Sequence, residues 1–395
     1  MNMFKKITIL TLIFIISCSL VSNFYINAEE VEFDISARSA ILMEAKTGEV
    51  LYSKNPDKKL APASMTKIMT MLLVMEALEK EQVSLNDVIN VSPKASKMGG
   101  SQVYLEPGEK MTLRDLMKAI AISSANDASV AVAEYIAGTE GLFVKRMNEK
   151  AEELGMTNSY FYNTNGLPSG DKEITGNLTT ANDLALLTKE LLKYPQIFEW
   201  TSIWIDSLRD GEFVLNNTNK LVRHYAGADG LKTGYTSEAG YCVTATATRD
   251  NLKFIAVIMG AENSKKRFSE AAKLLSYGFN IYNNYHIIKK DQIVKKVDIW
   301  NGKNRELDAI AKNDLFVPMK RGEEDKFNRE IILEENLKAP IKKGEIIGSL
   351  KIFKGNLKIE ECELIAARKV EKTSIFKRFF RIVIKFLEKL INMIK

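Results

Sequence analysis

Stretches with a helical or strand-like pattern of hydrophobic residues follow one another along most of the chain. An apolar run over residues 68–78, without glycine or proline, predicts a buried helix. Residues 112–138 predict a pair of helices joined by the polar segment 123–127. Alternation over residues 240–247 and an apolar run over residues 254–260 predict two strands, which we expect in one sheet. This part of the chain should therefore mix helices with a sheet.

The pattern changes near Asn283. From there to about residue 373, short β-type runs alternate with lysine-rich turns, which is typical of a small all-β domain. We therefore expect an α/β (α+β) domain over residues 29–283 and a β-rich domain over residues 284–373.

Both ends of the chain have the composition of targeting segments. Residues 1–28 contain two early lysines, a long apolar run and a final alanine, which predicts a secretory signal peptide cleaved after Ala28. Residues 15–18 also resemble a lipoprotein cleavage box, so lipid on Cys18 is an alternative. Apolar and basic residues interleave over residues 374–395, which predicts an amphipathic helix in a membrane interface. The alternative for that helix is packing on its own domain.

The positive charge is concentrated in the tail. The 395 residues have a formal net charge of +6, while residues 368–395 alone contain nine Lys or Arg and two Glu. The remainder of the chain is close to neutral. We therefore expect an anionic membrane surface beside the tail and no nucleic-acid-binding body.

Cysteine and histidine are too few and too scattered for a metal centre. Besides Cys18 there are only Cys242 and Cys362, and the two histidines, His224 and His286, lack ligand spacing. We expect no metal, no cofactor and no disulfide framework. A Ser-His-Asp triad is also excluded, because neither histidine accompanies a nucleophile motif.

A possible nucleophile and base lie at the start of the first buried helix. Ser64 and Lys67 are three residues apart, so their side chains would share a helix face. The positive end of a helix favours an oxyanion, and a buried lysine can lose its proton and act as the base for the serine. The alternative is an N-cap at Ser64 with Lys67 on a solvated face. Residues 169–172 and 374–377 have the same spacing, but neither opens a buried helix.

Two more motifs follow in order. Ser124-Ala125-Asn126 interrupts the helical pair, where buried polar groups must find partners. It is either a capped helix–helix turn or a polar finger in a cleft. Lys232-Thr233-Gly234 lies at the head of a strand. Residues 84–86 and 46–48 spell the same two motifs, but they do not lie at an inter-helix turn and a strand head.

Together the three motifs resemble those of the low-molecular-mass penicillin-binding proteins that act as serine-type D-alanyl-D-alanine carboxypeptidases. The resemblance covers nearly the whole chain, although Ala125 stands where the family usually has glycine. It implies a β-lactamase-like catalytic domain, with an antiparallel sheet, flanking helices and a helical subdomain. It also implies a cell-wall role on peptidoglycan stem peptides ending in D-Ala-D-Ala, sensitivity to β-lactams, and a secreted enzyme at the outer face of the cytoplasmic membrane.

The reaction suggests a role for each motif. Ser64 attacks the carbonyl of the penultimate D-Ala, and Lys67 takes its proton, aided if Lys232 lies close enough to lower the pKa of Lys67. Ser124 relays a proton to the leaving amine. Asn126 holds the substrate amide.

Other residues are expected to bind substrate. Gly234 would let a substrate strand approach the sheet edge. By the resemblance, the N–H groups of Ser64 and Tyr235 form the oxyanion hole, and Arg267 reads the terminal carboxylate beside Thr233. The alternative for Arg267 is a solvated arginine on the next helix.

Two other functions need to be weighed. A class A β-lactamase requires a glutamate that activates the deacylating water, and Glu212 has the sequence context of one, but it lies in strand-like sequence near Lys232. A non-catalytic wall-binding module would have a degenerate site, against which the intact motifs argue. Turnover of a D-Ala-D-Ala peptide separates the three hypotheses.

Overall fold

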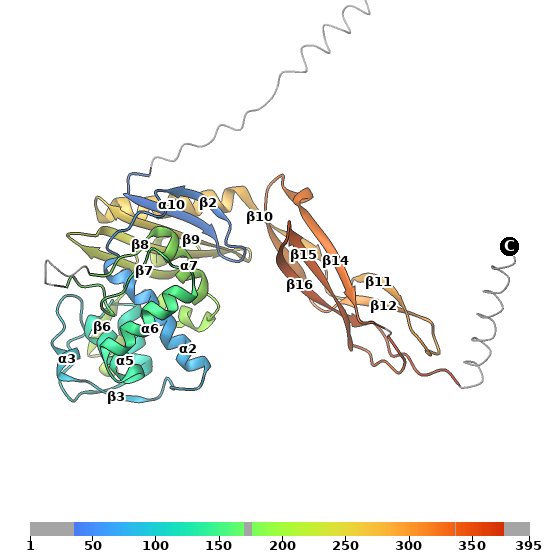
Figure 1. Ribbon diagram of the computed structural model, residues 1–395, viewed down its shortest axis with the longest axis horizontal. Coiled ribbons are helices and arrows are strands. Elements are labelled where there is room, and N and C mark those ends of the chain that lie inside the picture. The colour runs from blue at the N-terminus through green and yellow to red at the C-terminus, as the bar shows by residue number, and fades with distance from the viewer. Residues whose placement is uncertain (1–34, 170–175, 336, 375–395) are drawn as a thin grey trace, which may run out of the picture. The chain divides into compact units, whose positions relative to one another are not determined.

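The computed structural model describes residues 35–169, 176–335 and 337–374. Its first part is built on an antiparallel five-stranded sheet (Figure 1). The strands are, in spatial order, β2 (Val50–Lys54), β1 (Ser39–Glu44), β9 (Leu252–Ala261), β8 (Gly240–Arg249) and β7 (Ala228–Thr236). The predicted strands over 240–247 and 254–260 are thus neighbours in one sheet, as expected.

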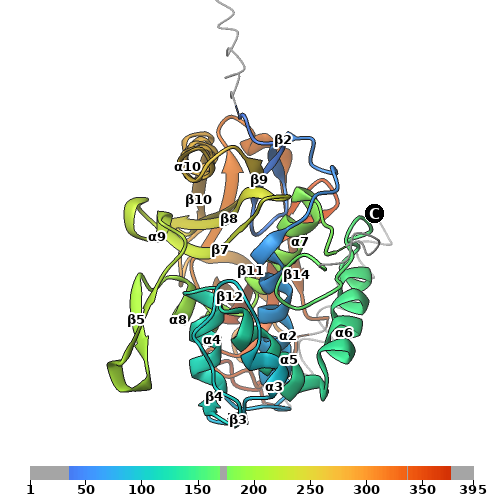
Figure 2. The same ribbon diagram turned by 90° about the vertical axis from the view of Figure 1, so that its left-hand side faces the viewer.

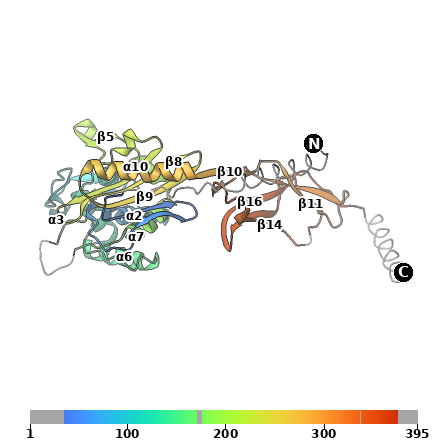
Figure 3. The ribbon, with the colours of Figure 1, turned by 90° about the horizontal axis from the view of Figure 1, so that it is seen from above.

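Helices cover both faces of this sheet. Helix α10 (Ser264–Ile281) lies along β8 and β9 on one face (Figure 3), and α7 (Ala181–Leu191) packs on β1 and β9 from the other. Because both faces are covered, the middle of β9 is buried at consecutive positions and not only at alternate ones. Strand β7 is at the end of the strand order, so one of its edges has no partner strand among the described residues.

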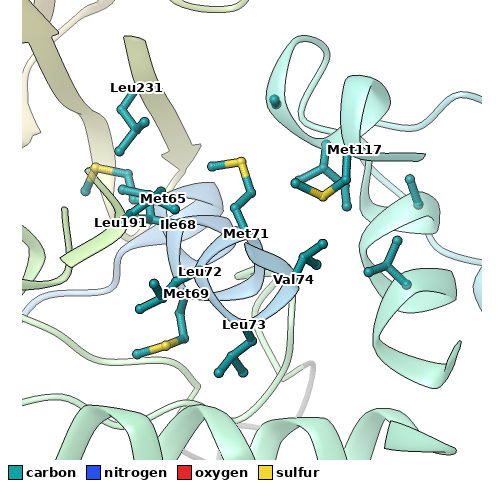
Figure 4. Packing of buried hydrophobic residues seen from close by; sticks show 14 of the residues in the cluster. Met65, Ile68, Met69, Met71, Leu72, Leu73, Val74, Met117, Leu191 and Leu231 are labelled. Atoms are coloured by element: carbon teal, nitrogen blue, oxygen red, sulfur yellow. The ribbon is translucent and has the colours of Figure 1, made fainter. Parts of the chain in front are cut away.

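Helix α2 (Lys67–Glu79) is the buried helix that the apolar run predicts. Its side chains pack in all directions, against the sheet, against α4 and against α7 (Figure 4). A helix that is apolar on every side is stable only inside a core. The labelled core side chains are Met65, Ile68, Met69, Met71, Leu72, Leu73, Val74, Met117, Leu191 and Leu231.

A helical layer lies below the sheet (Figure 2). Its elements are β3 (Val88–Asn90), α3 (Pro93–Ser96), β4 (Lys110–Thr112), α4 (Leu113–Ala121), α5 (Asn126–Ala137) and α6 (Glu140–Glu153). The hydroxyl of Thr112 accepts a hydrogen bond from the backbone N–H of Asp115, so α4 begins where its sequence signature predicts. The predicted helical pair is α4 and α5, and the polar segment 123–127 comprises the end of the turn between them and the first two residues of α5.

The segment between α7 and β7 forms short elements. They are η2 (Pro195–Ile197), α8 (Phe198–Thr201), β5 (Ile205–Leu208), η3 (Arg209–Gly211), β6 (Phe213–Asn216) and α9 (Leu221–His224). Strands β5 and β6 pair as a hairpin. Glu212 precedes β6 and is exposed.

The C-terminal part is all-β and has its own hydrophobic core. Strands β10 (Tyr282–Ile288) and β13 (Leu315–Lys320) pair, and a second sheet has the order β11-β12-β16-β15-β14. The strands of that sheet are β11 (Ile293–Asp298), β12 (Glu306–Ala311), β14 (Phe327–Leu333), β15 (Ile346–Lys354) and β16 (Leu357–Ala366), and η4 (Glu324–Lys326) precedes β14. The fold class is therefore the one predicted.

The predicted signal peptide and the amphipathic helix over residues 375–395 lie outside the described residues. In the part of the chain that the structure describes, no helix combines the length and apolar character needed to cross a bilayer.

Candidate active site

Ser64 and Lys67 meet at the start of α2. Ser64 lies in a 3₁₀ turn, η1 (Ala63–Thr66), which runs directly into the helix, and Lys67 Nζ is 3.0 Å from Ser64 Oγ. The serine hydroxyl does not cap the helix. Lys67 is fully buried, with 0% of its surface exposed. The N-cap alternative with a solvated lysine is therefore wrong.

Two neutral oxygen atoms fix the amine of Lys67. It donates hydrogen bonds to Asn126 Oδ1 at 2.6 Å and to the carbonyl of Asn165 at 2.9 Å. Burial, and next the positive charge of Lys232, hold the pKa of Lys67 well below its ordinary value. A neutral amine has two N–H groups and one lone pair. In that form, the two acceptors would take the N–H groups and leave the lone pair for the hydroxyl of Ser64.

Both ends of the Asn126 side-chain amide have partners within the protein. Besides binding Lys67, its Nδ2 donates to the carbonyl of Gly99 at 2.7 Å, and its main-chain N–H donates to the carbonyl of Ser101 at 2.7 Å. Gly100 has a φ of +77°, and a Cβ there would lie 2.9 Å from Asn126 Nδ2. A side chain at residue 100 would therefore crowd the amide of Asn126.

Ser124 combines a strained backbone with a hydroxyl that has no hydrogen-bond partner among the described residues. Its backbone is in the left-handed region at φ +64°, a costly conformation for serine. Its side chain is 4% exposed, and its hydroxyl has no hydrogen-bond partner among the described residues. The next residue, Ala125, is bound through its N–H to the carbonyl of Ala119. The unpaired hydroxyl at this strained position fits a proton relay that bonds the substrate.

Strand β7 packs its Lys-Thr-Gly motif directly against the Ser64 turn. A Cβ at Gly234 would lie 2.7 Å from the carbonyl oxygen of Pro62 and 3.2 Å from the N–H nitrogen of Ser64. Glycine is thus required by contact inside the protein, which the sequence interpretation missed. Lys232 is 1% exposed, and burial, followed by repulsion from Arg267, lowers its pKa to about 7.

Arg267 lies in the first turn of α10 and is only 7% exposed, so it is not a solvated arginine. Its Nη1 donates to the carbonyls of Gly234 and Cys242 in neighbouring strands, at 3.3 and 3.2 Å. Its Nε is buried without a hydrogen-bond partner in the described residues. The predicted arginine is therefore held against the Lys-Thr-Gly strand, and its Nε–H is unpaired among the described residues.

Thr233 and Tyr235 lie on the same strand but differ in exposure. Thr233 is 5% exposed, and its hydroxyl donates to the hydroxyl of Thr218 at 2.7 Å. Tyr235 is 56% exposed, and its ring lies 4.4 Å from that of Tyr241. The sequence interpretation did not find Thr218, because an isolated threonine before a strand has no motif.

A second missed component is the loop at residues 163–167. Its Asn165 carbonyl accepts from Lys67, and the neighbouring Thr164 donates its N–H and its hydroxyl to the carboxylate of Glu140. A Cβ on Gly166 would clash with the carbonyl of Ala63. The asparagine and glycine content of this segment was the available signal, but a main-chain acceptor has no side-chain signature.

The described residues offer no obvious metal site. They contain no group of three or more His, Cys, Asp or Glu side chains placed to hold an ion. Cys242 and Cys362 are both buried thiols and are not bonded to each other.

Comparison with known families decides the identity. The sequence profile of peptidase S11, described as D-alanyl-D-alanine carboxypeptidase, matches residues 26–263. The chain belongs to this family. The C-terminal domain profile of penicillin-binding protein 5 matches residues 282–372. The predicted function, a serine-type D-Ala-D-Ala carboxypeptidase of peptidoglycan metabolism, is confirmed at the level of the family.

Individual relatives agree with the family. D-alanyl-D-alanine carboxypeptidase DacF of Bacillus subtilis is 44% identical over 85% of this chain and 86% of its own. The crystal structure of a peptidoglycan synthesis regulatory factor, PBP3, from Streptococcus pneumoniae is 28% identical and has a TM-score of 0.75, covering 86% of this chain and 100% of that one. Penicillin-binding protein D2 from Listeria monocytogenes, in its ampicillin-bound form, is 33% identical with a TM-score of 0.57, over 62% of this chain and 99% of that one.

Proposed function

We propose that Ser64 is the nucleophile of this carboxypeptidase and that Lys67 is its base. The observation that supports this best is the triple contact of the Lys67 amine. Two fixed acceptors take its N–H groups, and the serine hydroxyl is 3.0 Å away. As Ser64 Oγ attacks the carbonyl carbon of the penultimate D-Ala, its proton passes to Nζ. The oxyanion is bound by the N–H groups of Ser64 and Tyr235.

Collapse of the tetrahedral intermediate then releases the terminal D-Ala. The hydroxyl of Ser124 passes a proton to the departing nitrogen, and the proton held by Lys67 restores Ser124. Water afterwards attacks the acyl-Ser64 ester, returning the serine and freeing the shortened stem peptide. Asn126, with both ends of its amide bound within the protein, contributes mainly by holding Lys67 and secondarily by contact with the substrate amide.

The substrate binds along the open edge of β7. Its backbone adds as a strand beside Lys232 and Gly234. The terminal carboxylate is recognised by the Thr233 hydroxyl, with the charges of Lys232 and Arg267 close to the same strand. This recognition makes the enzyme a carboxypeptidase instead of an endopeptidase. A class A β-lactamase mechanism has no support, since Glu212 is exposed ahead of β6.

Penicillin acylation tests the assignment of the nucleophile. A β-lactam presents a strained amide in place of the D-Ala-D-Ala bond, so it should form an ester with Ser64. We expect the intact mass to rise by one drug molecule, with the adduct on the peptide that contains Ser64, and Ser64→Ala to remain folded and unlabelled. Ser129→Ala is a suitable control, because Ser129 is also buried but bonds only the carbonyl of Thr164. An adduct on another residue would disprove the assignment.

We further propose the domain division predicted above and attachment at the outer face of the cytoplasmic membrane. Residues 1–28 direct secretion, and the basic amphipathic segment 374–395 lies on the lipid surface, where each basic residue near anionic lipid contributes about 1 kcal/mol. Deleting residues 374–395 should therefore move the enzyme from the membrane to the soluble fraction with unchanged peptide hydrolysis. A truncated protein that still sediments with membranes would favour lipid on Cys18 or an uncleaved signal.

A further inference from the structure

We propose that Thr218 is a specificity-determining residue, whose hydroxyl works with that of Thr233 to recognise the terminal carboxylate of the substrate. This inference rests on the function proposed above and deepens it. Its basis is the hydroxyl–hydroxyl hydrogen bond of 2.7 Å, in which Thr233 donates and Thr218 accepts.

Thr218 lies where two walls of the site meet. Its main-chain N–H donates to the carbonyl of Ile122 at 3.2 Å, two residues before Ser124. Its side chain contacts Thr233, in the middle of the Lys-Thr-Gly motif. The hydroxyl pair therefore bridges strand β7 and the loop that carries the unpaired Ser124.

Buried amides fix the backbone on both sides of Thr218. Asn217 is 5% exposed and donates through Nδ2 to the carbonyls of Thr201 and Ile203. Asn219 is 1% exposed and donates to the carbonyl of Gly230, at the start of β7. Residue 218, itself only partly buried, is thus a rigid support for a polar group.

Counting hydrogen atoms shows what the second hydroxyl adds. A threonine hydroxyl has one donor and two acceptor sites, and the single proton of Thr233 is directed at Thr218 in this structure. When a carboxylate arrives, Thr233 turns its proton to the anion. Thr218 then donates its own proton either to a lone pair of the Thr233 oxygen or directly to the carboxylate. Donation to Thr233 orients and polarises the hydroxyl that binds the anion, whereas donation to the carboxylate gives the anion a second donor that Thr233 alone lacks.

Arg267 does not make this second donor redundant. Its Nη1 is bonded to the carbonyls of Gly234 and Cys242, and its Nη2 to the hydroxyl of Ser264. With these N–H groups bonded inside the protein, the guanidinium attracts the substrate carboxylate through its positive charge. The two hydroxyls provide the directional hydrogen bonds to that carboxylate at the edge of the strand.

The test compares a free C-terminal carboxylate with its amide. Thr218→Val keeps the shape and removes the hydroxyl, Thr218→Ser keeps the hydroxyl, and Thr157→Val makes the same change at an exposed site. Values of kcat/KM are measured for an N-acylated D-Ala-D-Ala peptide and for the same peptide with an amidated C-terminus. Thermal unfolding of all four proteins shows whether each is folded.

We expect Thr218→Val to lower kcat/KM for the free acid about tenfold, the factor that corresponds to a hydrogen bond with a charged group. The amide should lose less than about threefold, because its terminal group is neutral. Thr218→Ser should stay within about threefold of wild type on both peptides, and Thr157→Val should be unchanged.

Equal losses on acid and amide would overturn the proposal and make Thr218 a purely structural residue. No loss on either peptide would overturn it as well. If the wild-type enzyme cleaves neither peptide, the proposed function is what fails. The acylation rates with benzylpenicillin and with its methyl ester then decide the role of Thr218 separately, because they differ in the same negative charge.

Discussion

At the scale of single residues, the proposed mechanism depends on the environment of one lysine, Lys67, which lowers its pKa. Burial removes the favourable hydration of the ammonium ion, and Lys232 adds repulsion. Asp127 opposes both effects, but it is already bonded to the backbone N–H groups of Val103 and Leu105. The net effect lowers the pKa of Lys67, which is the direction that the proposed role as the base for Ser64 requires.

Replacing Lys67 should abolish acylation while leaving Ser64 in place. We expect Lys67→Ala to lose several orders of magnitude in the acylation rate, since an unassisted serine is a poor nucleophile at neutral pH. In wild type, the rate should follow the neutral fraction of Lys67, rising with pH and then levelling well below pH 10.5, its ordinary pKa. Stopped-flow acylation by a chromogenic β-lactam measures both. Lys67→Arg places a permanent cation there that cannot act as a base, and near-normal rates in this variant would refute the assignment.

The sequence predicted these residues unevenly, for physical reasons. Ser64 and Lys67 were predictable because helical spacing alone places them on one face. The two acceptors of Lys67 differ in how well the sequence predicts them. The amide of Asn126 belongs to a motif, whereas Asn165 contributes a main-chain carbonyl, which every residue has. Gly234 was predicted to admit a substrate strand, and its contact with Pro62 was not foreseen, because only the folded chain brings the two residues together.

At the scale of elements, the loop 163–167 is held in place from α6. The carboxylate of Glu140 accepts the N–H and the hydroxyl of Thr164 at 3.2 and 3.0 Å and pairs with Lys94 at 2.7 Å. On the other side, the carbonyl of Thr164 accepts from Thr70 and Ser129. This bracing sets the position of the next carbonyl, that of Asn165.

Glu140→Ala should therefore reduce acylation although residue 140 contacts no substrate. Leaving the N–H and the hydroxyl of Thr164 buried without partners costs roughly 1–3 kcal/mol of stability each, and the loosened Asn165 carbonyl should lower kcat more than it raises KM. Glu140→Gln, which still offers one acceptor, should be intermediate. Glu149→Ala is the control, since Glu149 lies on the same helix in an exposed ion pair. Equal activity of Glu140→Ala and Glu149→Ala would show that the bracing is irrelevant to catalysis.

At the scale of the whole molecule, the described chain contains two separate hydrophobic cores, one under the five-stranded sheet and one among the C-terminal strands. The change of hydrophobic pattern near residue 283 is the local signal from which we predict two domains. Strand order was not predictable, because β1 pairs with β9 across more than half of the chain. Such long-range pairing depends on packing and leaves little trace in local sequence.

Stability should depend on pH because the active site buries lysine amines. Folded Lys232 releases its proton at about pH 7, and an ordinary lysine does so at 10.5. Between these values the unfolded chain binds more protons, so the free energy of unfolding rises with pH, by at most about 1.4 kcal/mol per pH unit from this group. Below pH 7 the penalty for burying the charged form is fully present. Urea unfolding at several pH values between 6 and 10 measures the trend.

Lys232→Met isolates the contribution of this lysine, because methionine fills similar space without a charge. The variant should gain stability relative to wild type at pH 6, and the difference should shrink steadily as the pH approaches 10.5, where lysine is neutral in both states. Lys273→Met, at an exposed position of α10, is the control for the general effect of replacing a lysine by methionine. A wild-type enzyme whose advantage over Lys232→Met grows toward low pH would mean that Lys232 stays protonated in the folded state, paired with an anion. Lys232 would then keep, at neutral and higher pH, the positive charge that helps to lower the pKa of Lys67.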